Sequence, residues 1–99
     1  MISDLPEFID FSAKRALSDT ITPYVLGITI SYNKDLMVFR VYFEPEATDE
    51  DKELLDDAMG EMAADLWQEI AFFEYQPIVI ESGEKMEPLM EWLYVRDKT

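Results

Sequence analysis

The chain has 99 residues, of which 48% are hydrophobic, and its 22 acidic against 8 basic side chains give a net charge of −14. This length fits one domain spanning residues 1–99, and the apolar content excludes a disordered acidic segment. Because the chain lacks cysteine and histidine and has no apolar run of ~18 residues, disulfides, thiolate metal sites, histidine catalysis and a membrane span are excluded.

The first predicted element is a helix from about Leu5 to Asp19. Asp4 suits the N-cap position, and Glu7 follows three residues later, as in a capping box. Small and apolar residues recur at helical spacing and predict one buried face, formed by Leu5, Phe8, Ile9, Ser12, Ala13, Ala16 and Leu17.

Two strands are predicted next, Tyr24–Tyr32 and Leu36–Phe43, joined by a turn at Asn33–Asp35. In the first strand one face is expected to carry Tyr24, Leu26, Ile28, Ile30 and Tyr32. In the second strand one face is expected to carry Met37, Phe39, Val41 and Phe43. The period of two and the short turn together predict an antiparallel hairpin.

The segment Glu44–Glu69 contains eleven carboxylates and one lysine, and it also has the pattern of an amphipathic helix. Thr48 is the expected N-cap, and the helix is predicted to run to about Glu69. The expected buried stripe consists of Leu55, Met59, Met62, Ala63, Leu66 and Ile70. Five carboxylates fall on the opposite side, here named the acidic row: Glu50, Glu53, Asp57, Glu61 and Asp65.

The remaining elements are two strands, Phe72–Glu81 and Glu91–Arg96. Pro77 cannot donate a hydrogen bond to a neighbouring strand, so the first of them is expected at a sheet edge or with a bulge. The element order α-β-β-α-β-β predicts an α+β fold of two layers. Two helices are expected to pack on one face of a four-stranded, mainly antiparallel sheet, with Leu55, Met59, Met62 and Leu66 against Ile28, Ile30, Phe39 and Val41.

Residue patterns typical of catalysis or cofactor binding are missing from the sequence. The three glycines stand far apart and form no phosphate-binding loop, and no nucleophile has a histidine beside it. We therefore predict no catalytic residue, no metal site and no cofactor. A small carboxylate-dependent enzyme is kept as an alternative, because two carboxylates can perform acid–base chemistry.

A folded, strongly negative surface attracts basic protein surfaces and repels nucleic acid and anionic membranes. The sequence thus predicts a basic protein as the partner, bound by the acidic row. A second candidate surface combines Arg40 and Tyr42 with Trp92 and Tyr94, since these residue types are enriched in binding hot spots. It is equally consistent that Trp92 and Tyr94 point into the core and that Tyr42 is an ordinary exposed strand residue.

The early helix, the hairpin strands Tyr24–Tyr32 and Leu36–Phe43, the acidic run Glu44–Glu53 and the closing strand Glu91–Arg96 together resemble a known group of proteins. These are the small immunity proteins encoded beside contact-dependent growth inhibition toxins and related polymorphic toxins. The resemblance implies a cytoplasmic inhibitor without catalytic residues that binds one cognate toxin domain, often a nuclease, and blocks its active site.

A different interpretation is an acidic adaptor, or nucleic-acid mimic, that binds a basic housekeeping protein. A homodimer formed through an open sheet edge or the apolar hairpin face is compatible with each of these functions. The start of the sequence lacks the basic region of a secretory signal, which favours a location in the cytoplasm.

Overall fold

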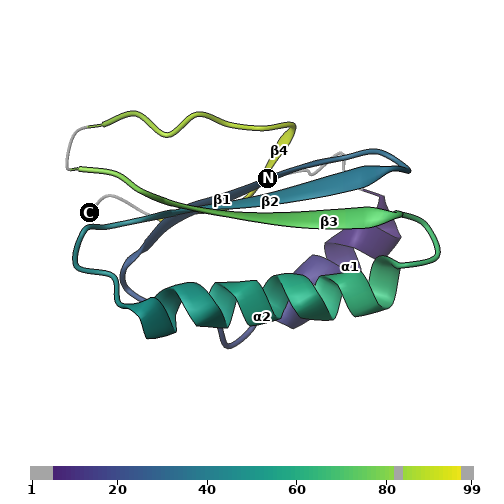
Figure 1. The fold of residues 1–99 in the computed structure, drawn as a ribbon, viewed down its shortest axis with the longest axis horizontal. Coiled ribbons are helices and arrows are strands. Elements are labelled where there is room, and N and C mark those ends of the chain that lie inside the picture. Colours follow the sequence, from purple (N-terminus) through teal and green to yellow (C-terminus); the bar gives the residue numbers. More distant parts are fainter. Residues whose placement is uncertain (1–5, 82–83, 97–99) are drawn as a thin grey trace.

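A computed structural model describes residues 6–81 and 84–96 of the chain. The elements are α1 (Glu7–Leu17), β1 (Val25–Tyr32), β2 (Leu36–Phe43), α2 (Asp49–Leu66), β3 (Phe72–Val79) and β4 (Glu91–Val95). Both helices lie on the same side of the sheet (Figure 1). The predicted element order and the two-layer α+β fold are thereby confirmed.

The four strands form one mixed sheet in the order β3-β2-β1-β4. Strand β1 pairs antiparallel with β2 and with β4, whereas β2 pairs parallel with β3. The parallel pair arises because α2 brings the chain back to the end of the sheet at which β2 begins, so β3 runs in the same direction as β2. Strand β3 is at the edge of the sheet, which is where Pro77 was expected to place it.

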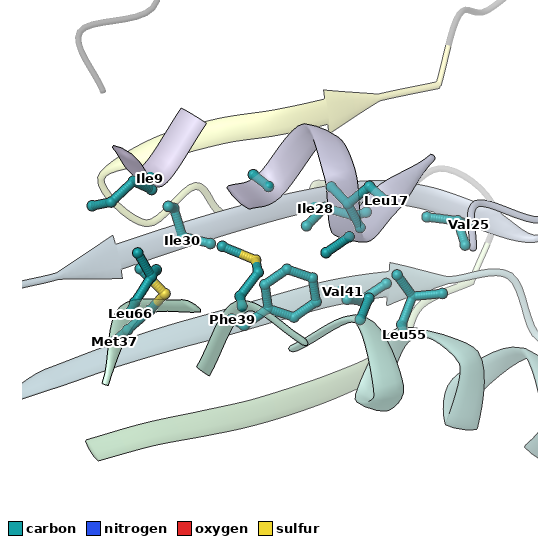
Figure 2. Close-up of a cluster of buried hydrophobic side chains, with 14 of the residues drawn as sticks. Ile9, Leu17, Val25, Ile28, Ile30, Met37, Phe39, Val41, Leu55 and Leu66 are labelled. Carbon is teal, nitrogen blue, oxygen red and sulfur yellow. The ribbon is translucent and has the colours of Figure 1, made fainter. Parts of the chain in front are cut away.

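The hydrophobic core lies between the sheet and the two helices (Figure 2). It contains Ile9 and Leu17 of α1, Ile28 and Ile30 of β1, Met37, Phe39 and Val41 of β2, and Leu55, Met62 and Leu66 of α2. The predicted packing of Leu55, Met62 and Leu66 with Ile28, Ile30, Phe39 and Val41 in one core is thus confirmed. Met59 is only partly buried at the margin, because Ala58 takes the fully buried position in that turn of α2.

Helix α1 is shorter than predicted. It begins at Glu7 after Pro6, which provides no side-chain cap, and it ends at Leu17. The expected cap Asp4 and the expected first residue Leu5 lie outside the described residues. Phe8 was expected on the buried face but is 47% exposed.

The strict alternation predicted for the first strand is wrong at its beginning. The register against β2 shifts between Val25 and Gly27, which is a β-bulge. The extra residue of a bulge shifts the alternation of side chains by one position. Val25 before the bulge therefore points into the core, as do Ile28 and Ile30 after it. Tyr24 precedes the strand and stays exposed.

Candidate partner-binding surface

Helix α2 begins with a capping box that uses one of the acidic side chains. The backbone N–H of Asp51 donates to Thr48 Oγ1 at 3.2 Å, and the backbone N–H of Thr48 donates to Asp51 Oδ2 at 2.8 Å. The hydrogen bond from the Thr48 backbone holds the pKa of the Asp51 carboxyl below its ordinary range. Asp51 therefore stabilises the start of the helix and is not available to a partner.

Glu44 also has a partner within the molecule. Its carboxylate forms an ion pair with Arg96 Nη1 at 3.1 Å, and this guanidinium also donates to the backbone oxygen of Pro23 at 2.8 Å. The hydrogen bond from Arg96 lowers the pKa of Glu44. This contact ties the residue after β4 to the residue after β2 and leaves little of the Glu44 charge for a partner.

Four members of the acidic row, Glu50, Glu53, Asp57 and Glu61, are exposed on α2. Within residues 6–81 and 84–96, none of them has a cationic nitrogen within 4.0 Å. Residues four apart on a helix lie about 6 Å from each other, so these carboxylates form a continuous negative strip. We name these four residues the outer acidic row.

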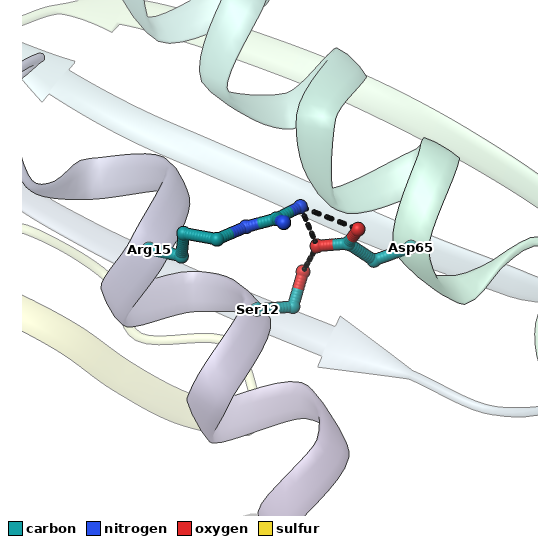
Figure 3. A network of polar contacts seen from close by, with 3 residues as sticks. All are labelled: Ser12, Arg15 and Asp65. Carbon is teal, nitrogen blue, oxygen red and sulfur yellow. Dashed lines mark hydrogen bonds and ion pairs between the residues drawn. The ribbon is translucent and has the colours of Figure 1, made fainter.

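The fifth member, Asp65, points toward α1 and not outward (Figure 3). Its carboxylate accepts a hydrogen bond from Ser12 Oγ at 2.7 Å and forms an ion pair with the Arg15 guanidinium. On the other side of α2, the hydroxyl of Tyr75 in β3 donates to the backbone oxygen of Lys52 at 2.7 Å. Contacts on both flanks therefore fix the orientation in which α2 presents the outer acidic row.

The second candidate surface is largely covered in the structure. Tyr42 is only 4% exposed, and its hydroxyl donates to the backbone oxygen of Glu87 at 2.7 Å and accepts from the Glu87 N–H at 3.0 Å. Arg40 donates from Nε to Gln76 Oε1 at 3.0 Å and from Nη1 to Tyr42 Oη at 3.3 Å. The chain before β4 thus covers this end of the sheet face opposite the helices.

Trp92 and Tyr94 lie on opposite faces of the sheet, contrary to their prediction as members of one candidate surface. The pairing of β4 with β1 shifts between Thr29, opposite Trp92, and Ile28, opposite Tyr94. Trp92 therefore packs beside Tyr42, with ring centres 6.4 Å apart, whereas Tyr94 packs against the core. The structure does not bring the four residues of the second candidate surface together as one exposed patch.

A groove between α1 and the end of α2 was missed by the sequence reasoning. Its volume is about 270 Å³, and its lining consists of Phe8, Phe11, Ser12, Arg15, Asp65, Leu66 and Glu69. Phe11 is 70% exposed and Phe8 47%. The sequence signal was a phenylalanine at position 11, outside the apolar face of an amphipathic helix.

Residues 7–98 match the family described as MafI2 immunity protein. The matched range includes all the surfaces described above. The chain belongs to the MafI2 immunity protein family. It is therefore an immunity protein, and its partner is the toxin that it neutralises. Among the residues described, neither helix of this immunity protein is long and apolar enough to cross a membrane.

Solved structures with a similar backbone are variants of the MamM CTD. A double-substitution variant is 18% identical with a TM-score of 0.48, over 87% of this chain and 94% of that chain. A zinc form of a single-substitution variant is also 18% identical with a TM-score of 0.48, over 83% of this chain and 93% of that chain. No functional conclusion follows from similarity at this level. No curated protein matches this immunity protein.

Proposed function

We propose that this immunity protein neutralises its toxin by direct binding through the outer acidic row, and that the toxin is a basic nuclease. The observation that carries the proposal is the exposure of Glu50, Glu53, Asp57 and Glu61 without a cationic partner in the described part of the chain. A nuclease must present Lys and Arg side chains to bind phosphates, and carboxylates can occupy the same side chains. The inhibitor then competes with the nucleic acid.

The charge of the whole chain supports this proposal. A net charge of −14 on 99 residues creates a strong attractive potential for a basic protein. Such steering raises association rates by about 10–10³-fold and weakens steeply as salt increases. Fast capture suits an inhibitor that has to occupy a toxin before the toxin reaches its substrate. Action against a nuclease also fits a location in the cytoplasm, and a toxin of the contact-dependent growth inhibition or related polymorphic class.

The acidic-adaptor alternative differs from this proposal only in the partner, and membership of an immunity protein family favours a toxin over a housekeeping protein.

The enzyme alternative requires carboxyl groups with raised pKa values in a cleft. Within the described part of the chain, hydrogen bonds lower the pKa values of the Glu44 and Asp51 carboxyl groups, which is the opposite direction. This supports a binding protein without catalytic residues of its own.

The test is a charge-reversed variant carrying Glu53→Lys, Asp57→Lys and Glu61→Lys. The matched control carries Asp19→Lys, Asp35→Lys and Glu81→Lys, three exposed carboxylates outside α2. Both variants reach the same net charge, so only the location of the reversed charges differs. Association with the purified toxin domain encoded beside this protein is measured by surface-binding kinetics at low and at physiological salt.

We expect the α2 variant to associate about 10–100-fold more slowly at low salt, with a flatter salt dependence. The control should lose far less, because its charges lie away from the contact. Equal losses in the two variants would mean that only net charge matters. An unchanged rate in the α2 variant would contradict the proposed binding surface.

A further inference from the structure

Two phenylalanines of α1 are exposed although the helix has a well-defined buried side. Ile9, Ala13 and Ala16 face the core, whereas Phe8 and Phe11 lie toward α2 and solvent. Both phenylalanine rings line the groove, and the buried Leu66 contributes to the same lining from α2. Apolar side chains that share one concave surface, unlike scattered exposed ones, mark an interaction site.

The groove is held in place before any partner arrives. Asp65 of α2 accepts a hydrogen bond from Ser12 and pairs with Arg15, so two residues of α1 one turn apart are fixed to the other wall (Figure 3). A preformed site loses little conformational freedom on binding. Its volume of about 270 Å³ is below the ~300–1,000 Å³ of small-molecule sites and suits one side chain of a protein partner.

The charges around the groove select the kind of partner. Glu69 forms part of the lining, Glu7 precedes Phe8 as an exposed residue, and Glu61 stands one turn before Asp65 on α2. Among the described residues that line the groove, the cationic one is Arg15, which is already paired with Asp65. An apolar side chain with basic neighbours is complementary to this arrangement, whereas a phosphate-bearing ligand is repelled.

We propose that this groove receives an apolar anchor residue of the toxin, flanked in the toxin by lysine or arginine. The inference rests on the proposed function and adds a second contact to it. The outer acidic row accelerates the encounter, and the groove determines how long the complex lasts. Buried apolar anchors in central pockets typically control dissociation, whereas exposed charges control association.

The experiment replaces Phe11 with serine and compares this variant with Phe72→Ser. Phe72 is a matched control because it is equally exposed, at 71% against 70%. It lies on the sheet face away from the helices, since its neighbour Phe73 packs against the core. Dissociation from the purified toxin domain encoded beside this protein is measured for the wild type, both variants and Phe8→Ser. Circular dichroism confirms that each variant is folded.

We expect Phe11→Ser to dissociate at least tenfold faster, which corresponds to about 1.4 kcal/mol, with an unchanged association rate. Phe8→Ser should change dissociation in the same direction, and Phe72→Ser should leave it unchanged. Unchanged dissociation of Phe11→Ser would overturn the groove proposal. The proposal would also be overturned if the free wild-type protein sediments as a dimer, Phe11→Ser sediments as a monomer, and toxin dissociation is unchanged. The groove would then hold a second copy of this chain.

These outcomes are separable from those of the charge-reversed variant. One outcome is slower association after reversal of Glu53, Asp57 and Glu61 while dissociation of Phe11→Ser is normal. This result supports the acidic surface as a contact and contradicts the groove proposal. Faster dissociation of Phe11→Ser with normal association of the charge-reversed variant supports the groove and removes the acidic surface.

Discussion

The carboxylates of the segment Glu44–Glu69 fall into two groups. Some have a hydrogen-bond or ion-pair partner within the described part of the protein and stabilise the fold, and others are exposed without such a partner there. Glu44 is paired with Arg96, Asp51 caps α2 at Thr48, and Asp65 joins α2 to α1. Substitution of these three residues would weaken the fold, so a loss of toxin binding in such variants would have an ambiguous cause. The exposed carboxylates of the outer acidic row are the ones whose substitution reports on binding.

At the same scale, Tyr42 provides a test of whether the sheet face opposite the helices takes part in recognition. Tyr42→Phe removes the hydroxyl that pairs with both the N–H and the C=O of Glu87. Leaving these groups without a partner should lower the free energy of unfolding by about 1–3 kcal/mol in urea titrations. Toxin binding should be unchanged once the variant is folded, because Tyr42 is buried.

Tyr24→Phe is the control for Tyr42→Phe, because Tyr24 is exposed and its hydroxyl has no hydrogen bond within the described residues. It should leave stability unchanged. Normal stability of Tyr42→Phe together with weaker toxin binding would contradict this account, because it would show that the sheet face opposite the helices contacts the toxin.

At the scale of the element, the outer acidic row has a cost to the helix that carries it. Glu53, Asp57 and Glu61 are spaced four apart, and like charges at this spacing destabilise a helix by about 0.2–0.5 kcal/mol per pair. An ordinary surface helix would mix the signs of its charges. The repeated repulsion is explained if the negative strip serves a basic partner.

Asp57→Lys should therefore stabilise the protein and impair its function. The substitution turns two repulsive pairs into attractive ones and introduces a better helix former, for a gain of about 1 kcal/mol in the free energy of unfolding. Association with the toxin should slow down. Asp35→Lys, in the turn between β1 and β2, makes the same change in net charge outside α2 and should alter neither quantity much. A destabilised Asp57→Lys variant would contradict this account of α2.

The elements themselves were predictable because their hydrophobic periods are clear, as in β2 and in the buried stripe of α2. The register shifts between β1 and its neighbours β2 and β4 were not predictable, since a bulge leaves the sequence period intact and only changes which face each residue occupies. Gly27 carried a hint, because a Cβ at this position would lie 3.0 Å from Met86 Sδ and from the Trp92 ring. Such a close approach depends on tertiary packing, which the sequence alone does not show.

The same limit applies to the candidate surface. The outer acidic row follows from helical spacing alone, so it could be predicted. The inward direction of Asp65 depends on where α1 crosses α2, and the covering of Tyr42 depends on the chain before β4. The groove beside Phe11 needs both helices in place and therefore appears only in the folded molecule.

At the scale of the whole molecule, the fold separates two faces. Both helices lie on one side of the sheet, so the outer acidic row and the groove are on the same side of the protein (Figure 1). Three of the basic side chains, Lys14, Arg15 and Arg96, are paired with acidic residues within the described part of the chain. The two helices carry ten carboxylates against Lys14, Arg15 and Lys52, so the helical side is strongly negative. It also carries a preformed apolar recess, a combination that fits a basic protein with an apolar anchor.

The central claim is that the immunity protein occupies the site at which the toxin binds nucleic acid. It is tested most directly by displacement of a fluorescently labelled oligonucleotide from a catalytically inactive form of the toxin domain. We predict that the immunity protein displaces the oligonucleotide completely and competitively, and that the Glu53→Lys, Asp57→Lys, Glu61→Lys variant displaces it much less effectively. A stable ternary complex of toxin, oligonucleotide and immunity protein would contradict the claim.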